Sequence, residues 1–286
     1  MVSGVVHHFG PYLYRSAFHA TTEEEECERA LDHLRDLITF EGPGTIAAVI
    51  LETIVGTNGI LMPPDGYLAG VRALCDEFGI VMIADEVMSG FARAGEWFAI
   101  QHWDVVPDLI TFAKGVNSGY VPLGGVIISQ AIAATFATQP YPGGLTYSGH
   151  PLACASAVAS IQIFEDQGIL DHARRIGDDV IGPRLRELAS RHPSVGEVRG
   201  LGVFWAVELV RDRMTREPLV PFNAAGAAAG PMNEVAAACK ERGLWPFTHF
   251  NRVHVVPPCT VSAAEVREGL SILDEALAVA DSHYSG

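Results

Sequence analysis

The sequence lacks any run of basic residues and any long apolar run, and these absences exclude several classes of protein. Its formal net charge is −15, with no cluster of Lys and Arg to offset it. Nucleic acids and anionic membrane surfaces attract clustered cations, so neither is an expected partner. No apolar stretch reaches the roughly 18 residues of a membrane span. The start, MVSGVVHHFGP, lacks the pattern of a signal peptide, so we expect a cytoplasmic protein.

Cysteine is also scarce, and its spacing carries no motif. The five cysteines are scattered along the chain, at Cys27, Cys75, Cys154, Cys239 and Cys259. They form no closely spaced pairs of the kind that bind zinc or make a redox couple. We therefore expect reduced thiols, mostly in packed faces, and no bound metal.

Apolar residues, in contrast, are plentiful. They make up 49% of the 286 residues, enough for one large domain or two modest ones. In the first half, apolar runs over residues 46–51 and 80–84 indicate buried strands, and residues 65–78 between them have helical spacing. This alternation is typical of a parallel sheet with right-handed crossovers. The pattern further predicts helices over 23–40 and 151–165 and strands over 109–113 and 126–129.

From Gly168 onward the pattern changes to α+β. It predicts an amphipathic helix to about residue 192, strands over 195–198, 203–210 and 252–256, and helices over 231–242 and 262–280. We place a domain boundary near Asp166. This boundary divides the chain into a large domain of residues 1–166 and a small domain of residues 167–286.

Two polar residues follow buried strands in the large domain, Asp85 and Lys114. In open α/β sheets, ligands bind at the carboxyl ends of the strands. A lysine beside the interior loses hydration, which favours the neutral, nucleophilic amine, and a nearby aspartate can hold a positive charge on a bound group. The two residues alone leave another interpretation open, in which Asp85 caps the next turn and Lys114 is an ordinary solvated residue.

The residues around this pair resemble class III aminotransferases, which are pyridoxal 5'-phosphate (PLP) enzymes of fold type I. The motifs IADEV, PDLITFAKG, YVPLGGV and LTYSGHPLACA occur in the family's order, and the resemblance runs from about Pro11 to the C-terminus. It implies a mostly parallel sheet, incomplete at the N-terminus, followed by an α+β small domain. It also implies a homodimer, because the family builds each site from two chains.

The resemblance assigns a role to each matching residue. Lys114 forms the internal aldimine with PLP and then moves a proton at the substrate carbon. Asp85 pairs with the pyridine nitrogen, and Val87 packs on the ring. Thr146 reaches a cofactor phosphate across the dimer interface, although it is otherwise a plain turn hydroxyl. Glu52 matches a strand-end carboxylate near the active site, although such a residue can equally bond only to backbone amides.

Two positions depart from the family's pattern. Members that use both an ω-amine and an α-amino acid such as glutamate often have a gating glutamate where this chain has Thr57. They bind the α-carboxylate with an arginine where this chain has His254. Both changes weaken an assignment to 2-oxoglutarate and favour pyruvate or an aldehyde. Arg252 lies on the same strand face as His254 and could replace the missing guanidinium, unless it is a solvated strand residue.

One part of the family's active site has no match in this sequence, namely the loop that binds the PLP phosphate. No glycine/serine loop that would bind the PLP phosphate opens a helix ahead of Glu23. A shortened product or wrongly assigned start, a separately encoded N-terminal partner and a non-catalytic remnant remain as interpretations.

The expected reaction is transfer of an amino group from an amine or amino acid to an oxo acid such as pyruvate. A PLP-dependent aminomutase, which would share Asp85 and Lys114, and a catalytically incompetent fragment or subunit are the alternatives. A nicotinamide-dependent oxidoreductase is set aside because the glycines that follow Lys114 do not match its fingerprint.

Overall fold

The computed structural model describes residues 3–286, which form two compact units. The first unit runs to Ile54 and includes Met62–Gly90 and Phe98–Gln162. The second unit consists of Val55–Leu61, Phe91–Trp97 and Ile163–Gly286. Two short segments from the first half of the chain therefore belong to the second unit, and the boundary near Asp166 stays a prediction. Within residues 3–286, none of the helices is both long and apolar enough to cross a membrane.

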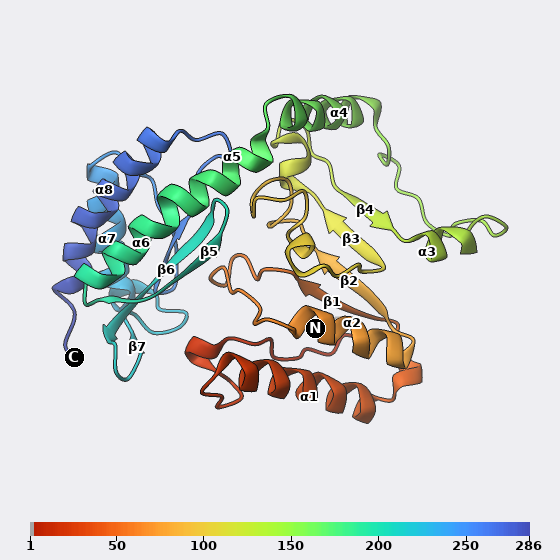
Figure 1. Ribbon diagram of the computed structural model, residues 1–286, viewed down its shortest axis with the longest axis horizontal. Helices are drawn as coiled ribbons and strands as arrows, with labels where there is room; N and C mark the ends of the chain where they lie inside the picture. The colour runs from red at the N-terminus through yellow and green to blue at the C-terminus, as the bar shows by residue number, and fades with distance from the viewer. Residues whose placement is uncertain (1–2) are drawn as a thin grey trace. The chain divides into compact units, whose positions relative to one another are not determined.

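The first unit is built on a four-stranded sheet (Figure 1). Its strands are β1 (Ala48–Glu52), β2 (Val81–Asp85), β3 (Leu109–Phe112) and β4 (Gly125–Ile128). The first three are parallel, and β4 runs antiparallel to β3. The connection from β3 to β4 contains only the short turn η4 (Lys114–Asn117), without the crossover helix that usually joins parallel strands. The expected mostly parallel sheet is confirmed.

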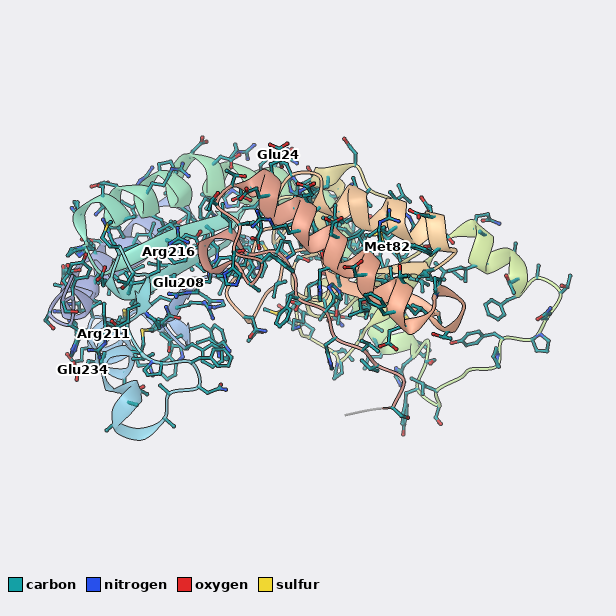
Figure 2. All side chains as sticks on the ribbon, turned by 90° about the horizontal axis from the view of Figure 1, so that it is seen from below. Glu24, Met82, Glu208, Arg211, Arg216 and Glu234 are labelled. Atoms are coloured by element: carbon teal, nitrogen blue, oxygen red, sulfur yellow. The ribbon has the colours of Figure 1, made fainter. Side chains whose placement is uncertain are left out.

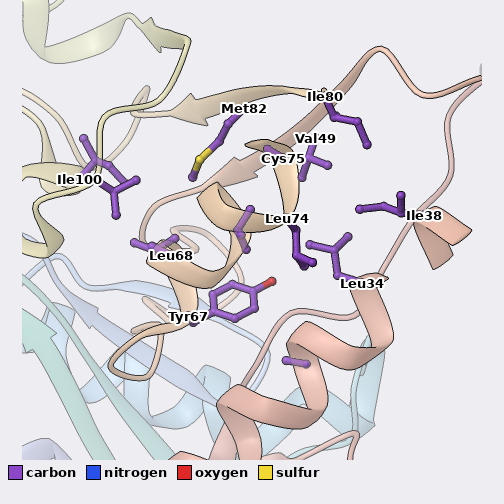
Figure 3. Packing of buried hydrophobic residues seen from close by; sticks show 13 residues of the cluster. Leu34, Ile38, Val49, Tyr67, Leu68, Leu74, Cys75, Ile80, Met82 and Ile100 are labelled. Carbon is purple, nitrogen blue, oxygen red and sulfur yellow. The ribbon is translucent and has the colours of Figure 1, made fainter. Parts of the chain in front are cut away.

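Two helices cover one face of this sheet, α1 (Glu23–Glu41) and α2 (Tyr67–Phe78). The hydroxyl of Thr22 caps α1 by accepting the Glu25 N–H at 3.2 Å. Figure 3 shows the resulting core, in which apolar side chains from both helices meet those of β1 and β2. The core includes Leu34, Ile38, Val49, Leu68, Leu74 and Met82. The helices predicted over 23–40 and 65–78 are thus confirmed within two residues.

The opposite face of the sheet carries an apolar row. The strand register aligns Ile50, Ile83, Leu109 and Ile128 across all four strands. The two outer members are largely exposed, Ile50 at 58% and Ile128 at 44%. Because side chains alternate between faces, Asp85, two residues beyond Ile83, lies on this same face.

The rest of the first unit is made of short elements and one long helix. The short ones are η1 (Leu13–Arg15), η2 (Pro43–Thr45), η3 (Ala99–Trp103) and α3 (Gln130–Thr135). The long helix α4 (Pro151–Asp166), whose residues from Ile163 onward belong to the second unit, confirms the helix predicted over 151–165. Helix α3 was not predicted, because six residues are too few to show helical periodicity.

The second unit combines helices with an antiparallel sheet in the order β5-β6-β9-β8. Its strands are β5 (Val195–Leu201), β6 (Phe204–Asp212), β7 (Glu217–Pro218), β8 (Phe247–His249) and β9 (Arg252–Val255). Its helical elements are α5 (Ile169–Ile176), η5 (Gly177–Ile181), α6 (Gly182–Arg191), η6 (Gly226–Ala229), α7 (Gly230–Glu241) and α8 (Ala263–Asp281). The α+β pattern is confirmed. Strands β7 and β8 were missed because they are too short to show alternation.

Candidate active site

A polar row lies at the carboxyl ends of the three parallel strands. The register places Glu52 of β1, Asp85 of β2 and Thr111 of β3 side by side. All three residues are partly buried. The Thr111 Oγ1 atom is buried and has no hydrogen-bond partner among the described residues. Sequence reasoning missed Thr111, although its position near the end of the predicted strand, three residues before Lys114, was a usable signal.

Only one oxygen of the Asp85 carboxylate accepts a hydrogen bond from the described part of the protein. Its Oδ1 atom accepts the backbone N–H of Val87 at 3.0 Å, so Asp85 does cap the turn that follows β2. Its Oδ2 atom makes no hydrogen bond within residues 3–286. Asp85 can therefore cap the turn and still present one carboxylate oxygen to a bound cation, so the two interpretations of this residue are compatible.

Lys114 follows β3 in a strained backbone conformation. Its φ of 44° lies in the left-handed region, which costs a non-glycine residue on the order of 1–3 kcal/mol and is typical of functional sites. The side chain is exposed, and in the described part of the chain it has no ion-pair or hydrogen-bond partner. The expectation that Lys114 loses its hydration beside the interior was wrong, because β3 ends at Phe112 and the lysine lies on the turn beyond it.

Thr146 lies in an exposed turn of the first unit. The Ser148 N–H closes this turn by bonding to the Leu145 carbonyl at 2.9 Å. The turn therefore holds the Thr146 hydroxyl at the surface, where another molecule can contact it. Its proposed reach across a dimer interface stays a prediction.

The second unit holds Thr57, Arg252 and His254. Thr57 is exposed on a tight turn in which the N–H groups of Gly59 and Ile60 bond to the Gly56 carbonyl, at 3.0 and 2.9 Å. Arg252, on β9, is only 8% exposed, so its interpretation as a solvated strand residue is wrong.

Arg252 belongs to a buried charge cluster centred on Glu208 of β6. Figure 2 labels Glu208. Glu208 is fully buried and pairs through Oε2 with Arg252 Nε at 3.3 Å and with an Arg199 terminal nitrogen at 3.0 Å. Arg199 also pairs with Glu197 and donates from Nε to the Gly59 carbonyl at 2.8 Å. Two guanidinium groups thus face two carboxylates, which balances the charge inside the cluster. The substrate role predicted for Arg252 stays a prediction.

His254 is a neutral residue in the same sheet. It is 5% exposed, and its ring meets the ring of Phe247 edge-on at 4.9 Å between centroids. Desolvation by burial, followed by the nearby charge of Arg199, lowers the pKa of His254 to about 4. At neutral pH this imidazole therefore carries no charge with which to replace an arginine.

The sequence profile of the family described as aminotransferase class-III matches residues 3–277. The chain belongs to the class III aminotransferases. Members of this family depend on PLP, so the family and the cofactor expected from the motifs are confirmed at the level of the family.

Similar proteins extend this result. The chain is 40% identical over 247 residues to the uncharacterized aminotransferase YhxA of Bacillus subtilis (strain 168), covering 84% of this chain and 51% of that protein. It is 34% identical over 281 residues to gamma-aminobutyrate transaminase 1, mitochondrial, of Oryza sativa subsp. indica, covering 96% and 52%. It spans about half the length of these relatives.

A solved structure matches the whole fold. The taurine:2-oxoglutarate aminotransferase from Bifidobacterium kashiwanohense, in complex with PLP and glutamate, aligns with a TM-score of 0.93 and 38% identity. The alignment covers 98% of this chain and 62% of that chain. The fold type I architecture expected from the motifs is thereby confirmed.

Residues of the first unit suit two groups of PLP, the ring nitrogen and the aldehyde. The open Oδ2 atom of Asp85 suits a protonated ring nitrogen, and the unpartnered amine of Lys114 suits an aldehyde. The partnerless hydroxyl of Thr111, in register with Asp85, offers a further polar contact. For the phosphate, Thr146 is the one residue with a role implied by the resemblance.

Proposed function

We propose that this chain carries the lysine-bearing part of a transaminase site, which moves an amino group from an amine or amino acid to an oxo acid such as pyruvate. The observation that supports it most is Lys114, an exposed amine without a partner in the described chain, on a strained turn after β3. When bound, PLP supplies an electron sink for the reacting carbon.

Each residue of the site then has a defined task. The Lys114 amine would hold the cofactor covalently and would move a proton at the reacting carbon. Asp85 would keep the ring nitrogen protonated through its open oxygen, and Val87 would pack on the ring. In a homodimer, Thr146 would reach the phosphate in the site of the neighbouring copy. The proposal places the enzyme in the cytoplasm.

The second unit favours an acceptor with a single carboxylate. His254 is neutral where the family's carboxylate-binding arginine would stand, and Thr57 has no charge. Arg252 already faces Glu208 in a cluster that is internally balanced. A second substrate carboxylate would therefore find no uncommitted cation among these residues, which supports pyruvate over 2-oxoglutarate.

A second candidate function is a contribution to a site that other residues complete. The apolar row on the Asp85 face is largely exposed at Ile50 and Ile128, and exposed apolar patches mark surfaces that bind another segment. The matched relatives are about twice as long. The completing segment would supply phosphate ligands, whether it precedes residue 1 in the same chain or comes from another polypeptide.

The proposed function is tested by the visible absorption spectrum of the protein with added PLP, before and after borohydride reduction. Lys114 and Lys240 are the two lysines of the sequence, so Lys114→Ala has a matched control in Lys240→Ala. Lys240 lies 4.3 Å from the centroid of the Trp245 ring, and its replacement leaves the strand ends intact. We expect reduction to attach the cofactor to the peptide that contains Lys114, in the wild type and in the control variant.

Two outcomes would contradict the proposal in different ways. Attachment that survives Lys114→Ala would remove that lysine from the site. A folded wild type without any absorption band would favour the second candidate, in which a further segment must complete the site. Where the absorption band forms, initial rates with pyruvate and with 2-oxoglutarate show which acceptor is preferred. Equal rates would contradict the proposed preference for an acceptor with a single carboxylate.

A further inference from the structure

Glu86, the residue after Asp85, has a fully buried carboxylate that four donors saturate. Its Oε1 atom accepts the Thr53 hydroxyl at 2.8 Å and the Ile100 N–H at 2.7 Å. Its Oε2 atom accepts the Ser89 hydroxyl at 2.5 Å and the Ala99 N–H at 3.0 Å. Because both oxygens are fully used within the protein, Glu86 is not placed to bind a substrate or cofactor.

The four donors come from the segments that shape the edge of the sheet. Thr53 directly follows Glu52 at the end of β1, and Ser89 lies on the turn after β2. The two backbone donors open η3. One buried side chain therefore ties the ends of two strands to the start of a third segment, all within the first unit.

The backbone of Glu86 adds two further ties. Its N–H donates to the Thr111 carbonyl at 2.9 Å, and its own carbonyl accepts the Gly90 N–H at 3.0 Å. The first bond continues the β2–β3 ladder beyond the register pair of Asp85 and Thr111. The second closes the turn whose Val87 N–H donates to Asp85 Oδ1. The orientation of the Asp85 carboxylate thus depends on a turn that Glu86 holds from both sides.

Burying the Glu86 carboxylate costs free energy. Its contribution is the orientation of the strand ends and of the turn after β2. A buried carboxylate loses its hydration at a large cost in free energy, and an apolar side chain would fill the same space without that loss. What the charge adds is direction, because four short bonds allow the two strand ends and the turn only one relative arrangement. Successive side chains of a strand point to opposite faces, so Glu86 faces inward while Asp85 faces the cofactor side.

We propose that Glu86 is a positioning residue for amino transfer, which holds the turn after β2 so that the free oxygen of Asp85 stays aimed at the cofactor ring. This inference rests on the proposed function for its purpose. The mechanical part, that Glu86 orients Asp85, can be measured without cofactor.

The variant Glu86→Gln tests this role with almost no change in shape. An amide nitrogen replaces one carboxylate oxygen, so one of the backbone N–H groups of Ala99 and Ile100 loses its acceptor, whereas the hydroxyls can turn. The matched control is Glu26→Gln in α1. Glu26 is also fully buried, but it accepts the Tyr12 N–H at 2.7 Å, away from the strand ends.

The first measurement is amide hydrogen exchange of residues 85–90 in the protein without cofactor. We expect Glu86→Gln to raise the exchange rate about tenfold, the equivalent of one lost hydrogen bond to a charged group. Glu26→Gln is expected to leave this segment unchanged. Equal exchange in the wild type and in Glu86→Gln would overturn the proposal.

The second measurement is a double-mutant cycle on PLP affinity with Asp85→Asn. If Glu86 acts through Asp85, Glu86→Gln weakens PLP binding about tenfold in the wild type and within about twofold once Asp85 is replaced. Effects that simply multiply would show a general structural role and overturn the inference.

The measurements distinguish a failure of the proposed function from a failure of the positioning role of Glu86. If the wild type binds no PLP, the proposed function fails, while the exchange measurement still decides whether Glu86 orients Asp85. If Glu86→Gln does not fold, Thr53→Val removes one of the four donors instead. It is expected to raise exchange in residues 85–90 about tenfold, as the loss of one hydrogen bond to a charged group would, and an unchanged rate would count against the proposal.

Discussion

Glu208 on β6 stands opposite Arg252 on β9 in the sheet register, and the pair is joined at 3.3 Å between Oε2 and Nε. The same oxygen lies 3.0 Å from Arg199. One fully buried carboxylate thus contacts two buried guanidinium groups, and Glu197, paired with Arg199, supplies the second negative charge. This relationship explains why the Arg252 guanidinium is already paired inside the second unit.

Replacing Glu208 with Ala should destabilise the protein strongly. Two buried cations would lose their shared counter-charge, and breaking a buried pair costs about 3 kcal/mol or more of unfolding free energy. Denaturant unfolding measures this loss. Glu275→Ala is the control, because Glu275 pairs with Arg242 at an exposed position, 63% and 41% exposed respectively, where a pair is worth about 1 kcal/mol or less. Similar losses in both variants would contradict the assigned role.

Replacing Asp85 with Asn should abolish most of the proposed activity while leaving the fold intact. The Asn carbonyl can still accept the Val87 N–H, so the turn survives. The negative charge that keeps the ring nitrogen protonated is lost, and we expect a fall in kcat of about a hundredfold or more. Turnover and thermal unfolding should be measured on one preparation. A variant that unfolds early would make Asp85 mainly structural.

The stability of the protein should fall in mild acid because of His254. Its pKa is about 4 in the folded protein and 6.5 in the reference state, so the unfolded chain takes up the proton first. The contribution is complete above pH 6.5 and is lost as pH falls from there to about 4, by about 3 kcal/mol.

The variant His254→Phe isolates this contribution, because a phenyl ring cannot take up a proton. Denaturant unfolding between pH 7 and pH 4 should show a shallower decline in the variant than in the wild type. Parallel curves would mean that other groups control the acid sensitivity.

Gly177, between α5 and α6, should not tolerate a side chain. A Cβ atom there would lie 2.1 Å from the Gly202 carbonyl oxygen, and backbone cannot move aside cheaply. We expect Gly177→Ala to lower the free energy of unfolding by about 3 kcal/mol. Gly269→Ala in α8 is the matched control, with its nearest neighbour, Leu244 Cδ1, at 3.6 Å. There the added methyl group should be neutral or stabilise the helix by up to about 1 kcal/mol. Equal stability of the two variants would show that the α5–α6 junction can relax.

The family, the layered architecture and most element boundaries could be predicted from the amino-acid sequence. Local signals were sufficient for this. The threonine cap and acidic first turn at Thr22–Glu26 start α1, and apolar runs ending in Glu52 and Asp85 mark β1 and β2. Because parallel strands end at one edge, their order also placed Glu52 and Asp85 near each other.

Which side chains already have partners inside the protein could be learned only from the three-dimensional fold. Thr111 lies in the polar row, and Glu86 is a buried carboxylate whose two oxygens both accept hydrogen bonds. Arg252 pairs with Glu208, which lies 44 residues away in the sequence. Lys114 proved exposed because its strand stops two residues earlier. Such facts depend on the register between strands and on contacts between distant segments. The periodicity of the local sequence predicts neither of them.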